Sequence, residues 1–214
     1  FIKRSLVIKG YDEEALHEAD SEDIDLGALS ECFKPRVFKK TDLYTLGLLV
    51  KEQNKTFLSV GGMLLFGKNK QQYFPDAWIQ VGRFGGKDKS HIIDQYNIKD
   101  NLARSIEEAI DFVQKHIFAG VEINAIKNHE VWSIPKIAIR EAIINAVVHA
   151  DYSLQGAPIR VSIFDDRIEV ENPGLLAIGL TIDDIISGIS KLRNRVIARV
   201  FHELRLIEQW GSGI

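Results

Sequence analysis

The sequence is poor in the residues that mark disulfide-bonded and membrane proteins. Its 214 residues include one cysteine, Cys32, and one methionine. A single cysteine excludes an internal disulfide framework and suits a reducing compartment. No apolar run approaches the length of a membrane span, and residues 1–5 (FIKRS) lack the apolar core of a signal peptide. We therefore expect a cytoplasmic protein with no membrane partner.

Several familiar catalytic signatures are also missing. The chain has no Ser-His-Asp arrangement and no Gly-x-x-x-x-Gly-Lys-Ser/Thr phosphate loop, which argues against a motor helicase. Its six histidines and single cysteine are scattered, without the paired spacing of a zinc site. With 45% hydrophobic and 27% charged residues, the composition is that of an ordinary globular protein.

The net charge of −3 is unevenly distributed along the chain. Residues 11–33 hold nine acidic side chains and no Lys or Arg, whereas residues 34–89 hold eleven bases against four acids. The basic segment suits contact with phosphates. The alternative is a solvated surface whose bases pair with the acidic stretch before it.

The hydrophobic patterns predict an α+β fold, a two-layer α/β sandwich with a mostly antiparallel sheet, preceded by a short helical segment. Residues 59–66 are apolar, and their pattern does not distinguish a helix from a strand. Helices are expected at 12–20, 24–32, 41–53, 102–117, 135–149, 182–187 and 194–204. Strands are expected at 77–84 and 91–96, and hairpins at 121–134 and 159–171.

The most informative segment is 140–152, REAIINAVVHADY. Glu141 and Asn145 lie four residues apart, so a helix places both on one face. A carboxylate beside a carboxamide suits water activation next to a nucleotide-bound Mg²⁺, an ion that prefers oxygen ligands and keeps several waters. His149 continues the row by one further turn. An isolated Glu-x-x-x-Asn pair is, however, also common as a surface or packing pair.

Two later segments contain residues suited to a nucleotide. Asn172-Pro173-Gly174 follows the second hairpin, and the Asn172 carboxamide both donates and accepts, as adenine requires. Gly211-Ser212-Gly213 near the end of the sequence has the form of a backbone cradle for phosphates. A flexible loop has the same composition.

Together these motifs resemble a known family. Segments 140–152, 166–169, 172–174, 193–194 and 207–214 are similar in order and spacing to the GHKL-type (Bergerat fold) ATP-binding domain of bacterial transcriptional regulators that carry the label of RecG-related ATP-dependent helicases. Segment 62–68 resembles the region that precedes this domain. In that family a Schlafen or Alba-like nucleic-acid-binding domain comes first. The resemblance implies that residues 1–53 are its tail or a helical linker, and that 54–214 form the ATPase-like domain, which stops inside its second Gly box.

The resemblance also implies site roles. Glu141 corresponds to the residue that activates water, and Asn145 to the Mg²⁺ ligand. The set expected around ATP and Mg²⁺ is Asn145, His149, Asp151, Asn172, Gly174, Arg193, Gly211 and Gly213. Purely structural roles are the alternative, because His149 and Asp151 suit the end of a helix and Arg193-Asn194 suits the start of one.

Several positions depart from the family pattern. Asn172 stands where the wider superfamily has an adenine-binding aspartate, and Leu175 replaces a second glycine. Val148 replaces a second acid, and Ala150 replaces a frequent arginine near the pocket. We expect one of two functions. The first is an ATP-binding regulatory module, hydrolytic or not, of a regulator that contacts DNA through its full-length parent. The second is a non-catalytic scaffold for dimerisation and DNA positioning.

Overall fold

A computed structural model describes residues 9–123, 134–177, 179–189 and 191–207. In chain order its elements are η1 (Tyr11–Glu13), β1 (Ala15–Asp20), η2 (Ser21–Asp23), α1 (Leu26–Cys32), α2 (Lys40–Leu46), β2 (Leu49–Glu52), β3 (Lys55–Ser59), α3 (Val60–Phe66), α4 (Lys70–Tyr73), β4 (Ile79–Phe84), β5 (Ile92–Ile98), α5 (Leu102–Ile123), α6 (Lys136–His149), β6 (Ile159–Ile163), β7 (Ile168–Glu171), α7 (Ile182–Ile186) and α8 (Arg195–Glu203).

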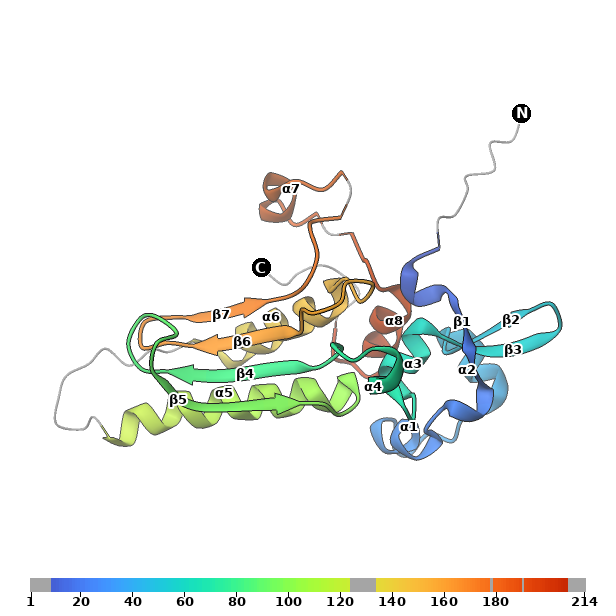
Figure 1. The fold of residues 1–214 in the computed structure, drawn as a ribbon, viewed down its shortest axis with the longest axis horizontal. Coiled ribbons are helices and arrows are strands. Elements are labelled where there is room, and N and C mark those ends of the chain that lie inside the picture. Colours follow the sequence, from blue (N-terminus) through green and yellow to red (C-terminus); the bar gives the residue numbers. More distant parts are fainter. Residues whose placement is uncertain (1–8, 124–133, 178, 190, 208–214) are drawn as a thin grey trace.

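The strands form two sheets that lie beside each other (Figure 1). The larger sheet has the order β5-β4-β6-β7, and the smaller sheet the order β1-β3-β2. All strand pairs are antiparallel except β4 with β6, which run parallel with Ile79 opposite Ile159. Helices α5 and α6 both pack against the larger sheet and against each other. The predicted α+β two-layer architecture with mostly antiparallel strands is therefore confirmed.

The larger sheet and its helices form because their apolar residues face one another. In α5 the residues at helical spacing are buried, among them Leu102, Ile106 and Val113. Ile79 and Val161 on the central strands are buried as well. Among the described residues, no helix combines the length and apolarity needed to cross a bilayer.

The first predicted helix is wrong. Residues 12–20 form the end of η1 and strand β1, which pairs with β3. The segment ALHEAD is rich in good helix formers, but pairing with a neighbouring strand overrides local propensity. Asp12 does not cap a helix of its own segment. It lies instead at the N-terminus of α8.

The third predicted helix, 41–53, is too long. Helix α2 ends at Gly47, whose φ of 79° gives the left-handed C-cap that favours glycine. Strand β2 follows, and a turn at Gln53 and Asn54, both with positive φ, leads into β3. The two signals for this break were Gly47 and the polar pair Gln53-Asn54.

The apolar segment 59–66, whose pattern fits a helix or a strand, forms helix α3. Ser59 caps this helix by accepting a hydrogen bond from the Gly62 amide at 2.8 Å. A Cβ at Gly62 would lie 2.4 Å from the Leu48 carbonyl oxygen, so only glycine allows this close approach. The predictions at 77–84, 91–96, 102–117, 159–171, 182–187 and 194–204 are confirmed with small shifts at their ends.

Part of the predicted hairpin at 121–134 is also wrong, because residues 121–123 belong to α5. Residues 124–133 lie outside the described part of the chain. The smaller sheet joins β1 and β2, which precede the predicted boundary at residue 54, to β3, which follows it. The division into residues 1–53 and 54–214 stays a prediction.

Candidate functional site

Helix α6 presents Glu141 and Asn145 on one face, as the sequence predicts. The helix begins directly after Pro135 and buries Ile143 and Val147 against the core, while Glu141 and Asn145 are half-buried. Asn145 Nδ2 donates a hydrogen bond to Glu141 Oε1 at 3.1 Å. This bond orients the carboxamide, so that the oxygen Oδ1 of Asn145 points away from the carboxylate.

The C-terminal end of α6 is held by a buried side chain from the start of α8. Asn194 Nδ2 donates to the carbonyl oxygens of Val148 at 2.8 Å and of Ala150 at 2.7 Å. The last carbonyls of a helix lack partners within the helix, and here Asn194 supplies them, since its backbone amide also donates to the Val148 carbonyl oxygen at 3.3 Å. Asn194 therefore occupies the position before α8, but its side chain caps the end of α6 instead of the start of α8.

Asp151, Gly174 and Arg193 meet beside this helix end. Arg193 forms an ion pair with Asp151 at 2.9 Å and also donates to the Leu175 carbonyl oxygen. The Asp151 amide donates to the Pro173 carbonyl oxygen at 2.9 Å. Gly174 has a φ of 109°, and a Cβ there would lie 2.7 Å from Asp151 Cβ. The turn at 173–174 is thus packed against Asp151 at a position that requires glycine.

His149 lies at the end of the α6 row and is half-buried. Burial lowers its pKa below the ordinary value, and the positive charge of Arg193 lowers it further. Both effects favour the neutral imidazole.

The remaining predicted residues lie apart or outside the described segments. Asn172 is exposed, and its Nδ2 donates to the adjacent Pro173 carbonyl oxygen at 3.3 Å. Gly211 and Gly213 fall outside the described residues. The structure thus forms two groups: Glu141 with Asn145 on α6, and Asp151 with Gly174 and Arg193 beyond its end.

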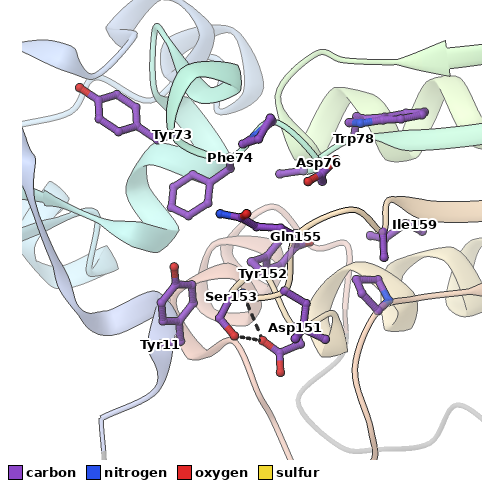
Figure 2. Close-up of a pocket in the computed structure, with 15 residues that line it drawn as sticks. Tyr11, Tyr73, Phe74, Asp76, Trp78, Asp151, Tyr152, Ser153, Gln155 and Ile159 are labelled. Atoms are coloured by element: carbon purple, nitrogen blue, oxygen red, sulfur yellow. Dashed lines mark hydrogen bonds between the residues drawn. The ribbon is translucent and has the colours of Figure 1, made fainter.

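A small cavity lies against the second group (Figure 2). Its volume is about 70 Å³, far below that of a nucleotide site. Asp151 lines it and accepts a hydrogen bond from Ser153 Oγ at 2.5 Å. Tyr152 also lines it, and burial raises the pKa of its hydroxyl, which donates to the Val147 carbonyl oxygen at 2.9 Å. This cavity alone does not accommodate ATP.

Sequence reasoning missed the role of Asp12, a fully buried carboxylate. It accepts hydrogen bonds from the amides of Arg195, Val196 and Ile197 at 3.0, 2.6 and 3.0 Å, which satisfies the start of α8. Burial raises its pKa to about 6, although the three amide donors oppose that change. No local pattern indicates a partner 183 residues away in the chain.

Both segments are fully described, and no Lys or Arg of the basic segment 34–89 forms an ion pair with a carboxylate of the acidic segment 11–33. The two segments meet instead through His17 and Glu52 at 3.6 Å, and through Lys68, which donates to the Glu22 carbonyl oxygen at 2.6 Å.

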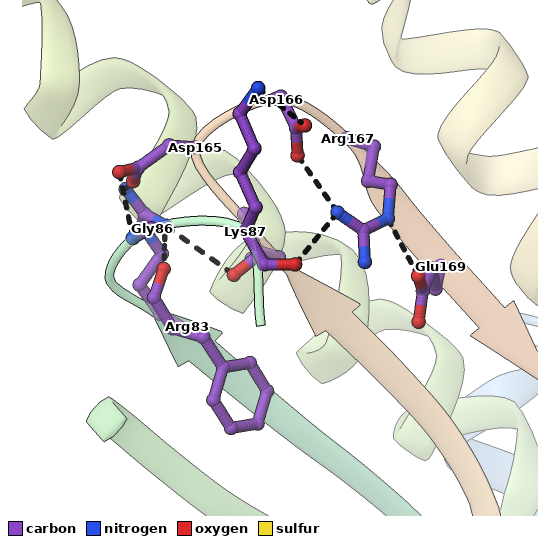
Figure 3. Close-up of polar contacts among 9 residues, drawn as sticks. Arg83, Gly86, Lys87, Asp165, Asp166, Arg167 and Glu169 are labelled. Atoms are coloured by element: carbon purple, nitrogen blue, oxygen red, sulfur yellow. Dashed lines mark hydrogen bonds and ion pairs between the residues drawn. The ribbon is translucent and has the colours of Figure 1, made fainter. Parts of the chain in front are cut away.

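Bases of the segment 34–89 form ion pairs elsewhere. Arg83 binds Asp165 at 2.5 Å, in the turn between β6 and β7 (Figure 3). Asp166 of the same turn lies 3.8 Å from Lys87, which belongs to the connection between β4 and β5. These contacts join the tip of the β4–β5 hairpin to the tip of the β6–β7 hairpin. They also pair two of the bases that the sequence analysis considered for phosphate contacts.

The match to a protein family concerns only part of the chain. Residues 156–214 match the family described as "Putative ATP-dependent DNA helicase recG C-terminal". The matched region begins just before β6, so it includes Asn172, Gly174 and Arg193 but not Glu141 or Asn145. This part of the chain is therefore similar to an ATPase-like domain.

A solved structure shares the fold over almost the whole chain. The DIP2311 protein from Corynebacterium diphtheriae is 22% identical, with a TM-score of 0.67 over 96% of this chain. The chain spans about a third of that protein's length, since 34% of it is covered. No match is found among curated proteins.

Proposed function

We propose that α6 carries an ATP·Mg²⁺ site in which Glu141 activates water and Asn145 binds the ion. The observation that carries this proposal is the hydrogen bond from Asn145 Nδ2 to Glu141 Oε1 at 3.1 Å. It turns the Asn145 oxygen away from the carboxylate and leaves Glu141 Oε2 for a water. A carboxylate that orients water and an oxygen ligand for the metal are the parts that phosphoryl transfer requires.

The residues on this face fit Mg²⁺ that arrives with a nucleotide. Among the described residues, no three His, Cys, Asp or Glu side chains gather into a metal site, so a cage made by protein alone is not available here. Mg²⁺ commonly takes one or two protein oxygens and completes its shell with waters and phosphates. When bound, the ion would supply charge stabilisation for the phosphates.

The rest of the pocket would come from the turn and the segment after it. We propose that Asn172 and Gly174 contact adenine, that Arg193, Gly211 and Gly213 contact phosphates, and that His149 and Asp151 line the end of α6. Arg193 would exchange Asp151 for a phosphate, because a more highly charged anion competes well for a guanidinium.

Residues 175–192 would act as a lid. In this segment α7 projects away from both sheets (Figure 1), and apolar side chains are exposed, including Leu175 at 90%, Ile182 at 67% and Ile186 at 76%. Apolar groups left in water on a projecting segment favour a second, closed position over a ligand. Closure would provide the volume that the small cavity lacks.

At the level of the whole protein, we propose that the site belongs to a regulatory module of a DNA-binding transcriptional regulator, acting as a homo-oligomer. The alternative is a non-catalytic scaffold for dimerisation and DNA positioning. One observation favours the alternative: Arg193 is already paired with Asp151, beside a cavity of only about 70 Å³.

Calorimetry and an ATPase assay on the 214-residue chain separate the two functions. We expect Mg²⁺-ATP to bind, Asn145→Ala to weaken the Mg²⁺-dependent part of the affinity about tenfold, and Glu141→Ala to abolish turnover while keeping most of the affinity. Glu108→Ala, an exposed carboxylate on α5, is the matched control and should behave as the unaltered chain. An absence of binding heat would exclude the ATP-binding module and favour the non-catalytic scaffold. Unchanged turnover in the Glu141 variant would show that Glu141 does not activate the water.

A further inference from the structure

A second and larger cavity lies away from the α6 site. Its volume is about 340 Å³, within the range of small-molecule sites. Its wall comes from the end of α3, from α4, from the start of α1 and from the turn before α5. Neither α6, the turn at 172–174 nor Arg193 contributes to it.

The most unusual residue of this wall is Lys70. Lys70 is only 6% exposed, and its Nζ donates a hydrogen bond to the Asp100 carbonyl oxygen. An ammonium group has three donors, so this one acceptor leaves two for a ligand. Burial lowers the pKa of Lys70 to about 8, and the negative charge of Asp100 offsets this only in part.

The charges around Lys70 also favour an anion. Lys68 and Lys99 line the same cavity, against the two carboxylates Asp25 and Asp100. Both carboxylates already have donors: Asp25 accepts from the Ala28 amide at 3.0 Å, and Asp100 accepts from the Asn101 amide at 2.6 Å and from Arg104. Lys68 also donates to the Glu22 carbonyl oxygen at 2.6 Å. Three lysines against two carboxylates leave the lining with a net positive charge.

We propose that this cavity binds a small metabolite bearing a phosphate group, with Lys70 as the buried contact and Lys68 and Lys99 at the rim. Lysine is a compact point charge suited to phosphate. The amide side chains of Asn69 and Gln72, which also line the cavity, provide donors and acceptors for the rest of such a ligand. The site is distinct from the proposed ATP site and does not depend on it.

Backbone amide NMR with inorganic phosphate as the probe tests the proposal. We expect saturable shifts at residues 67–72 and 99–101. Lys70→Met should weaken the response at least about tenfold, since a hydrogen bond between charged groups is lost. Lys99→Gln, an exposed rim variant that keeps the fold, should weaken it less. Lys55→Met, on the exposed start of β3, is the control and should change nothing.

Three results would overturn the proposal: shifts that do not saturate, a Lys70→Met or Lys99→Gln response equal to that of the unaltered chain, or tighter binding of malonate than of phosphate. The last would make the ligand a carboxylate. An Asn145→Ala variant should keep the phosphate response, so a failure of ATP binding at α6 is distinguished from a failure here. Shifts centred on residues 140–146 would show that the probe uses the α6 site instead.

Discussion

Asp12 ties the start of the described chain to its last helix through a buried carboxylate. Three amides of α8 donate to it, yet burial dominates and raises its pKa to about 6 from an ordinary 3.8. A group with a raised folded-state pKa contributes stability that is full below its unfolded pKa and lost as pH rises through the folded pKa. The window for Asp12 therefore runs from about pH 4 to above pH 6.

Asp12→Asn should remove this pH dependence. The free energy of unfolding of the unaltered chain minus that of the variant should fall by roughly 2 kcal/mol between pH 4 and pH 7. Urea unfolding of both proteins across this range measures the difference, because groups common to both cancel. A difference that grows with pH would mean that the amide donors outweigh burial.

Gly174 decides how closely the turn at 173–174 packs on Asp151. Gly174→Ala should destabilise the chain by roughly 2–3 kcal/mol, since it adds strain at positive φ and a Cβ 2.7 Å from Asp151 Cβ. Gly156→Ala is the matched control, with a φ of 82° and open space around the added Cβ, and should cost only about 1 kcal/mol. Equal losses in thermal unfolding would contradict the close contact.

At the scale of elements, the join between α6 and α8 determines the geometry beside the candidate site. Asn194 is 1% exposed and satisfies two carbonyls at the end of α6. Asn194→Ala should cost roughly 1–3 kcal/mol of unfolding free energy, because the buried Ala150 carbonyl would lose its donor, whereas the Val148 carbonyl would keep the backbone amide of residue 194. Asn97→Ala, on the exposed face of β5, should change stability by less than about 0.5 kcal/mol. A loss at Asn194 as small as at Asn97 would show that the end of α6 does not depend on it.

Elements with a strong local pattern could be predicted from the sequence. The apolar period of α5 and the alternating strands around the turn at Asp165-Asp166 are examples. Strand β1 could not, because ALHEAD favours a helix locally and becomes a strand only through its pairing with β3. The same limit applies to the site: Glu141 and Asn145 follow from helical spacing, whereas the Asp151–Arg193 pair joins residues 42 positions apart.

At the scale of the whole molecule, two sheets share one buried core, and α3 and α8 lie between the smaller sheet and the layer of α5 and α6. This arrangement links the proposed ATP site to both parts of the chain. Asp12 and Glu13 precede the smaller sheet, and they contact the start of α8, next to Arg193 and Asn194. A nucleotide that draws Arg193 away from Asp151 would therefore act on the join between the two sheets.

The position of the metal ion tests the central claim most directly. Mn²⁺ in place of Mg²⁺, added with a nonhydrolysable ATP analogue, broadens the NMR signals of nearby amides. We predict the strongest broadening at residues 140–146, present only with the nucleotide and lost in Asn145→Ala. Broadening centred elsewhere, or equal broadening without the nucleotide, would contradict an ATP·Mg²⁺ site on α6.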